Sequence, residues 1–273
     1  MEKIILSSNS HVLTRRRFVQ QAYAALAMAA CSSKLYAGIA GSQKQDISAD
    51  TSLKFHADGT ARSFAGNTII CHLPAQGAVR DALAALHDSL ARSSFRKKLG
   101  LTPVDSYHMT VFSGPTDQKR SRAIWPSYVP FDASIEDCNR IVGERMQQVR
   151  LHGELPLRMK FDKETTAGYP TACSLRLLPV DEAEGRKIQS LRSQIADAYG
   201  FRGPDFEAYG FHITISYQLQ TFAQAERTEY LDILSHHLPL IERSAPVLEL
   251  GNPEYCTFQD MRRFDIMKLL TCG

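Results

Sequence analysis

The sequence predicts an α+β protein in which two copies of one lobe face each other across a central cleft. Three observations support this fold class: the order strand, helix, strand occurs twice, the closing strand of each copy carries a His-x-Thr motif, and the copies keep nearly the same register. The histidine follows the start of its copy by 41 residues in one case (67 to 108) and by 40 in the other (172 to 212). We therefore expect a bilobal, pseudo-twofold arrangement with two β-sheets lining the cleft and helices outside.

The first copy begins with a strand predicted over 67–73, an apolar run closed by Pro74. A helix is predicted over 78–92, because its apolar residues recur at steps of four, three and four: Val79, Leu83, Leu86 and Leu90. A second strand is predicted over 106–112, and Gly114 marks its end.

The second copy repeats this order. A strand is predicted over 172–178 and is closed by Pro179. Asp181 and Glu184 have the spacing of a capping box at the start of the next helix. The apolar stripe of that helix consists of Ile188, Leu191, Ile195 and Ala198. Residues 211–217 again read as a strand.

Each copy is extended by one more helix and one more strand. In the first copy the helix lies near 134–149 and the strand covers 157–161. In the second copy they lie near 223–236 and 247–250, and residues 264–270 add a last strand.

The predicted organisation has three parts. Residues 1–37 form an export signal, 38–61 form a linker, and 62–273 form the bilobal domain. Its halves are roughly 62–165 and 166–273, and strands can exchange between them.

The composition is that of a globular protein. Of 273 residues, 44% are hydrophobic and 22% are charged, which argues against disorder and against a disulfide-dense miniprotein. The net charge of +3 comes from the leader, since residues 1–37 hold five basic groups and one acidic group; the rest has 27 basic and 28 acidic groups, a net of −1. A stable nucleic-acid complex is therefore not expected, although a nucleotide or a short RNA end is compatible.

The leader resembles a twin-arginine export signal. Arg15, Arg16 and Arg17 precede a short alanine-rich run over 22–30. This resemblance implies the twin-arginine export machinery as a partner and a periplasmic or extracellular location. The alternative is an amphipathic helix with a basic start. The run is too short to span a bilayer, and no run of about 18 uncharged apolar residues occurs elsewhere.

Two interpretations of the end of the leader stay open. Cleavage follows Ala37 or Ala40, or Cys31 becomes a lipidated N-terminus, because the three residues before it loosely resemble a lipoprotein cleavage box. A membrane is thus expected as a partner only through the leader or such a lipid.

Five cysteines follow that region, and none has C-x-x-C or zinc-ligand spacing: Cys71, Cys138, Cys173, Cys256 and Cys272. The odd number leaves at least one unpaired. Cys71 and Cys173 lie in predicted strands, so buried thiols are expected, and one disulfide stays an open alternative.

The two closing strands each have one apolar and one polar face. Side chains alternate along a strand, so Met109 and Ile213 point away from the histidine and threonine of their motifs. A pseudo-twofold axis would bring both polar faces to one cleft.

Two four-residue segments resemble the paired signatures of the two-histidine (2H) phosphoesterase superfamily, which includes cyclic phosphodiesterases and RNA 2′,5′-ligase-like proteins: His108-Met109-Thr110-Val111 and His212-Ile213-Thr214-Ile215. Gly66-Asn67-Thr68, Trp125-Pro126 and the Phe-His spelling of the second motif are similar to an uncharacterised branch, domain of unknown function 1868. The resemblance covers roughly 62–270 and implies the bilobal fold of that superfamily.

The residue types suit phosphodiester hydrolysis. One of the imidazoles of His108 and His212 can act as base toward water and the other as acid toward the leaving oxygen, with the roles unassigned. Thr110 and Thr214 can hold the phosphate oxygens. We therefore predict a metal-independent phosphodiesterase, a cyclic phosphodiesterase that opens a 2′,3′-cyclic phosphate or a related small nucleotide or RNA-end phosphodiester, with no cofactor.

Two rival functions are weighed against this prediction. The same fold could serve as a phosphate or nucleotide receptor without turnover. An exported hydrolase of another class is less favoured, because no Gly-x-Ser-x-Gly elbow occurs.

Five further residues are candidates for substrate binding: Arg158, Lys160, Arg176, His72 and Tyr217. The cations share the polar faces of their strands and could meet phosphate if those faces join the cleft; a solvated sheet face is the alternative. The side of the strand on which Tyr217 lies favours core packing. A zinc site made of His72, His108 and His212 would lack carboxylates or thiolates at suitable spacing.

Overall fold

The computed structural model describes residue 47 and residues 49–272. The leader predicted over 1–37 and Cys31 lie outside the described residues. None of the helices within the described range is long and apolar enough to cross a membrane.

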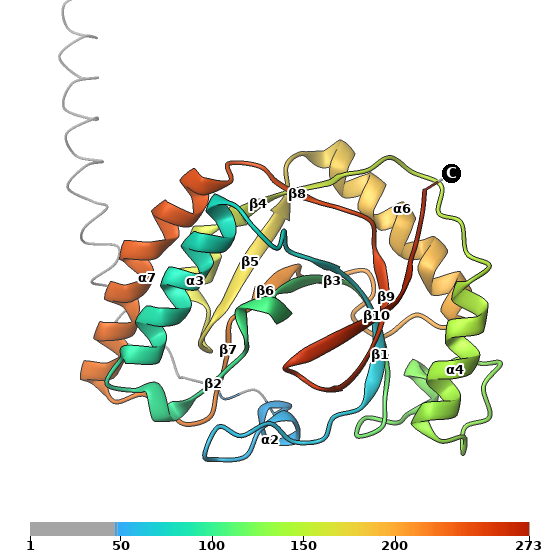
Figure 1. Ribbon diagram of the computed structural model, residues 1–273, viewed down its shortest axis with the longest axis horizontal. Coiled ribbons are helices and arrows are strands. Elements are labelled where there is room, and N and C mark those ends of the chain that lie inside the picture. The colour runs from blue at the N-terminus through green and yellow to red at the C-terminus, as the bar shows by residue number, and fades with distance from the viewer. Residues whose placement is uncertain (1–46, 48, 273) are drawn as a thin grey trace, which may run out of the picture. The chain divides into compact units, whose positions relative to one another are not determined.

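Eight antiparallel strands form one curled sheet in the order β10-β9-β1-β3-β6-β5-β4-β8 (Figure 1). Its strands are β1 (Gly66–His72), β3 (His108–Thr116), β4 (Leu157–Asp162), β5 (Ser174–Pro179), β6 (His212–Thr214), β8 (Leu248–Leu250), β9 (Glu254–Asp260) and β10 (Arg263–Leu269). A second sheet pairs β2 (Leu99–Leu101) with β7 (Ser216–Gln218). The predicted α+β class is confirmed, and the two expected sheets join through β3 and β6.

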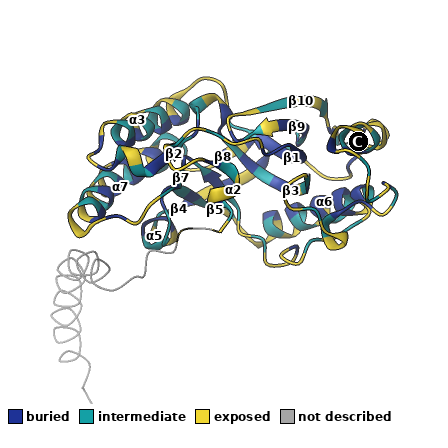
Figure 2. Ribbon diagram, turned by 90° about the horizontal axis from the view of Figure 1, so that it is seen from below, coloured by how far each residue is buried: buried dark blue, intermediate teal, exposed yellow. Residues whose placement is uncertain are grey.

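The helices are α2 (Thr51–Lys54), α3 (Ala78–Arg92), α4 (Ile135–Met146), α5 (Lys163–Gly168), α6 (Glu182–Tyr199) and α7 (Gln224–Ser244). The long helices cover the outside of the curl in two groups, whereas α2 lies at its open side (Figure 1). Helices α3 and α7 pack together on one side, and α4 and α6 on the other (Figure 1). In Figure 2 the central strands are mainly buried, whereas the helices carry buried and exposed residues side by side. The predicted stripe of α3 is buried at all four positions.

The halves of the sheet are built from both halves of the sequence. The first half gives one strand, β4, which pairs with β5, and the second half gives two, β9 and β10, which extend the sheet beyond β1. Strand β9 is absent from the sequence prediction. Tyr255, Cys256 and Phe258 are all buried, so the alternation that marks a one-sided strand is missing.

The strand predicted over 211–217 is wrong in one respect, because it is two strands in two sheets. Strand β6 pairs with β3 and β5, whereas β7 leaves the large sheet and pairs with β2. The break falls at Ile215, whose backbone N–H donates to the carbonyl of Cys173 at 2.9 Å. This change of sheet alters where Tyr217 points.

The start of α6 follows the predicted cap only in part. The side chain of Asp181 accepts from the N–H of Glu184 at 2.8 Å, as an N-cap does. Glu184 is buried, and its carboxylate instead accepts from Arg158 and forms an ion pair with Lys187. The described part of the stretch predicted as a linker packs on the domain, because Phe55 enters an aromatic cluster with Phe64 and Phe258.

Candidate active site

The two His-x-Thr motifs lie on neighbouring antiparallel strands. Met109 of β3 pairs with Ile213 of β6, and both side chains are fully buried. Residues on either side of this pair point to the opposite, concave face. This pairing places His108 opposite Thr214. It also places Thr110 opposite His212.

This arrangement extends into two rows of side chains that cross the sheet. Strand β1 adds one residue to each row, and β5 adds one on the other side. The first row consists of His72, His108, Thr214 and Ser174. The second row consists of Ile70, Thr110, His212 and Arg176.

One cavity of about 580 Å³ is lined by all four motif residues: His108, Thr110, His212 and Thr214. The two histidines are diagonal neighbours across β3 and β6, a relation in which residues lie about 7–8 Å apart. A phosphate group placed between the imidazoles can contact both rings at such a separation. The structure thus brings the two motifs into one hollow.

Both imidazoles are held in the same way by the backbone. Nδ1 of His108 lies 2.6 Å from the carbonyl oxygen of Ser106, and Nδ1 of His212 lies 2.9 Å from that of Gly210. A carbonyl only accepts, so Nδ1 carries the proton in each ring, an assignment that rests on the hydrogen-bond network. Nε2 of each neutral ring then bears the lone pair that general base catalysis requires.

Burial sets the protonation of these rings. It lowers the pKa of His108 to about 4, against a smaller opposing effect of the hydrogen bond to Ser106. Burial also lowers the pKa of His212, and the positive charge of Arg176 lowers it further. Both free imidazoles are therefore neutral at pH 7.

Comparison with known proteins identifies the first half of the domain. Residues 54–169 match the family model described as 2H-phosphodiest, a domain of unknown function (DUF1868). The predicted family is thereby confirmed over that range. The chain is also similar to the crystal structure of a conserved protein of unknown function, ATU0111, from Agrobacterium tumefaciens str. C58, with 25% identity and a TM-score of 0.74 over 85% of this chain and 96% of that chain. No curated protein matches.

The site carries cations that the sequence analysis did not single out. Lys54 of α2 and Lys119 line the cavity, and Lys54 lies 5.1 Å from the ring of Tyr217. Arg192 also lines it but is almost fully buried, because its guanidinium donates to the carbonyls of Val111 and Phe206. Lys119 forms an ion pair with Asp50, so Lys54 is the lysine available to attract an anion, whereas Arg192 stabilises the wall.

Aromatic rings make up much of the remaining wall. They are Phe64, Phe112, Phe201, Phe206, Tyr209, Tyr217, Phe258 and Phe264. Phe264 packs edge-on against His108 with ring centroids 4.3 Å apart, and Tyr209 lies 6.3 Å from the ring of His212. The cavity combines an apolar wall with cations, and its volume falls within the range of about 300–1,000 Å³ typical of small-molecule sites.

The five secondary candidates fall into different places. Tyr217 lines the cavity, contrary to the core packing favoured by its strand position, because the chain changes sheet at Ile215. Arg176 lines a smaller adjoining hollow with His212 and Thr214, and its guanidinium lies 4.8 Å from the ring of Tyr169.

The other three lie outside the residues that line either hollow. Arg158 and Lys160 are on β4, two strands from the motif of β6, and Arg158 forms an ion pair with Glu184 at 3.2 Å. His72 is in register with His108, but its Nδ1 is hydrogen-bonded to Glu254.

The missed residues share a physical cause. Lys54 belongs to a four-residue helix in a polar stretch, and the positions of Lys119 and Phe264 depend on how distant strands pair. The positive charge of Lys54 was the one signal in the sequence that could have suggested it as a phosphate-binding residue. Its position at the cavity depends on the burial of the neighbouring Phe55, which the local sequence pattern does not predict.

Proposed function

We propose that this chain is a metal-independent phosphodiesterase that opens a 2′,3′-cyclic phosphate or a related small nucleotide or RNA-end phosphodiester. The observation that supports this function is the opposed pair of His-x-Thr motifs, whose four polar side chains line one cavity. The matching 2H-phosphodiest family supports phosphoester chemistry at the coarser level.

In this mechanism each histidine handles one proton. Nε2 of the neutral imidazole removes a proton from water as the water oxygen bonds to phosphorus. Nε2–H of the protonated imidazole gives its proton to the ribose oxygen as the phosphorus–oxygen bond breaks. The charge of the pair is unchanged after turnover, and the proton has moved from one ring to the other. The backbone carbonyls that accept from Nδ1 hold each ring in place and stabilise its imidazolium form.

The threonines and cations orient the phosphate in this proposal. The hydroxyls of Thr110 and Thr214 donate to non-bridging oxygens and keep the attacking and leaving oxygens in line. Lys54 and Arg176, which both line the second hollow, offset the negative charge of the phosphate. The aromatic wall offers stacking surfaces, which favours a nucleotide over a bare phosphodiester.

A panel of substrates tests the function. The purified chain is incubated with the four 2′,3′-cyclic nucleotides and with a linear dinucleotide, in the presence of EDTA, and products are separated by chromatography. We expect EDTA-resistant hydrolysis of at least one cyclic nucleotide. His108→Ala and His212→Ala should each lower it by about 10²–10⁴-fold, whereas His152→Ala, at an exposed histidine that does not line the cavity, should not.

Three results would count against the proposal. Full activity in both active-site variants excludes the two-histidine mechanism. Activity that EDTA removes excludes metal independence. Saturable binding of a cyclic nucleotide with no product after long incubation would show that the chain is a nucleotide receptor of the same fold and not an enzyme.

We also propose that the protein is exported by the twin-arginine machinery, on the strength of the arginine run and the short apolar run that follows. Replacing Arg15, Arg16 and Arg17 by lysine should leave the chain in the cytoplasm, as cell fractionation would show. Unchanged export of that variant would refute the proposal.

A further inference from the structure

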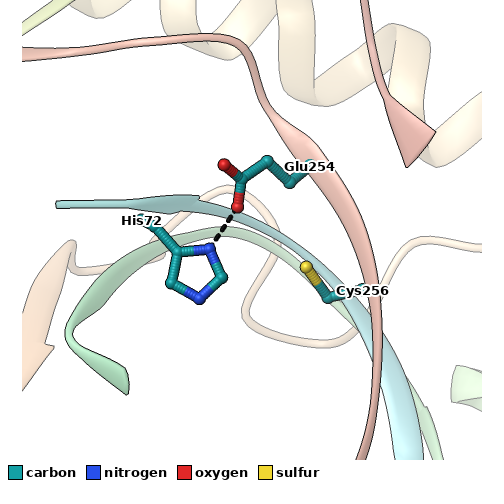
Figure 3. A group of neighbouring side chains, drawn as sticks. All are labelled: His72, Glu254 and Cys256. Atoms are coloured by element: carbon teal, nitrogen blue, oxygen red, sulfur yellow. Dashed lines mark hydrogen bonds and ion pairs between the residues drawn. The ribbon is translucent and has the colours of Figure 1, made fainter. Parts of the chain in front are cut away.

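A cluster of three metal-binding side chain types lies beside the catalytic cavity. His72 ends β1, and Glu254 and Cys256 lie two residues apart at the start of β9 (Figure 3). A ring nitrogen of His72, a carboxylate oxygen of Glu254 and Sγ of Cys256 all lie within 4.8 Å of one another. Figure 3 shows the three side chains pointing toward a common space.

We propose that His72, Glu254 and Cys256 bind one zinc ion. Imidazole, carboxylate and thiolate together are a donor set that zinc accepts, and thiolate disfavours magnesium and calcium. Zinc bonds of about 2.0–2.3 Å place the ligand atoms of a tetrahedral site roughly 3–4 Å apart. The three atoms, all within 4.8 Å of one another, are close to this spacing, and a fourth position is left for water.

Burial and charge favour a cation at this position. Cys256 is fully buried, and the side chains of His72 and Glu254 are only 20% and 13% exposed. Glu254 already holds Nδ1 of His72 by a hydrogen bond, so two of the ligands are oriented toward each other. Binding of Zn²⁺ releases the thiol proton, and the thiolate and the carboxylate then carry two negative charges, which the ion neutralises.

The site is separate from the proposed reaction centre. None of its three residues lines the catalytic cavity, although the ring of His72 lies 6.1 Å from that of His108. The ligands come from two paired strands, β1 and β9. Bound zinc would therefore join a strand of the first half of the sequence to one of the second, next to the wall that carries His108. This inference does not depend on the proposed function.

Metal binding to the full chain tests the inference. The chain is stripped of metal, loaded with Zn²⁺ or Co²⁺, dialysed and analysed for metal content and for cobalt absorption. We expect one zinc per chain, a thiolate-to-cobalt charge-transfer band, and a higher melting temperature with zinc. Because loss of an outer-shell partner alone costs about 10–100-fold in affinity, Cys256→Ser should weaken binding by about 100-fold or more and remove the cobalt band.

Two further sets of variants make the result decisive. His72→Gln and Glu254→Gln alter partly exposed side chains and should also weaken binding, which covers the case that Cys256→Ser does not fold. Cys71→Ser is the matched control: it is a buried thiol one residue from His72, but its Sγ bonds to the carbonyl of Gly251 at 3.7 Å. Absence of retained zinc, or equal binding in the Cys256, His72 and Glu254 variants, would overturn the site, whatever the hydrolysis assays show.

Discussion

The two rows that carry the histidines are alike in backbone and different in their flanking side chains. In both rows the imidazole donates from Nδ1 to a carbonyl two residues earlier, Ser106 in one and Gly210 in the other. The neighbour of His108 on β1 is His72, whereas the neighbour of His212 on β5 is Arg176. The repeated strand geometry therefore fixes both rings, and the strands outside the motifs decide the charge around each.

The difference also shows which physical effect controls the histidines. A guanidinium lies beside His212, yet the larger lowering of the pKa is that of His108, where burial is the main cause. Desolvation thus outweighs a neighbouring full charge at this site. The single proton that the proposed reaction requires is expected on His212 before turnover.

The largest effect is expected from removing the two rings. General acid–base catalysis contributes about 10²–10⁴-fold, so His108→Ala and His212→Ala should each lower kcat/KM by that order. The double variant should lose little more than the worse single variant, because the two groups act as a unit. Steady-state kinetics of the three variants measure this, and additive losses would show that the rows act independently.

The threonines test whether the rows are equivalent toward phosphate. Thr110→Val and Thr214→Val keep the side-chain shape and remove one hydroxyl each, which costs about 1.5–3 kcal/mol where the partner is charged, or roughly 10–150-fold in kcat/KM. We expect similar losses at both positions, since each threonine lies across from a histidine. A loss confined to one variant would assign phosphate binding to a single row.

Arg176 tests the flanking difference directly. Arg176→Gln removes the cation beside His212, and we expect KM to rise by about tenfold, equivalent to about 1.4 kcal/mol of phosphate binding. Arg186→Gln, at an exposed position on α6, is the matched control and should leave KM unchanged. The Arg176 effect should shrink at high salt if it is electrostatic. An unchanged KM in Arg176→Gln would leave Lys54 as the cation that binds the phosphate.

Local sequence patterns anticipated the parts of this molecule that depend on neighbouring residues. The stripe of α3, the alternation around Met109 and Ile213 and the cap at Asp181 are set within a few residues. The same alternation placed the histidines and threonines on one face. These patterns were sufficient to place the motif residues on one face of each strand, whereas the pairing of β3 with β6, which forms the rows, was not predicted.

Features that depend on pairing between distant segments were not accessible in this way. Strand β9 carries Glu254 and Cys256, which lie more than 180 residues from their neighbour His72. The break at Ile215, which turns Tyr217 toward the cavity, follows from competition between two sheets for one strand. Neither partner of such a pair carries a signal for the other in its own stretch of sequence.

The smallest effect, the position of the pH optimum, bears on the protonation difference between the rows. The reaction needs one neutral and one protonated imidazole, and this state is most populated between the two pKa values. Burial lowers the pKa of His108 to about 4 and that of His212 below its usual range, so the optimum of kcat/KM should lie on the acid side of pH 6.5.

This follows because kcat/KM reports the free enzyme, in which both imidazoles lose their protons as the pH rises. At pH 7.5, which is more than one pH unit above both pKa values, we expect kcat/KM to be about tenfold or more below its maximum. A bound phosphodiester anion favours the imidazolium form, so the profile of kcat should lie at higher pH than that of kcat/KM. Profiles of kcat and kcat/KM between pH 4 and 9, measured with the metal-stripped chain, show which of the two has its maximum at higher pH. A kcat/KM maximum at pH 7.5 or above would show that burial does not control the protonation of these two rings.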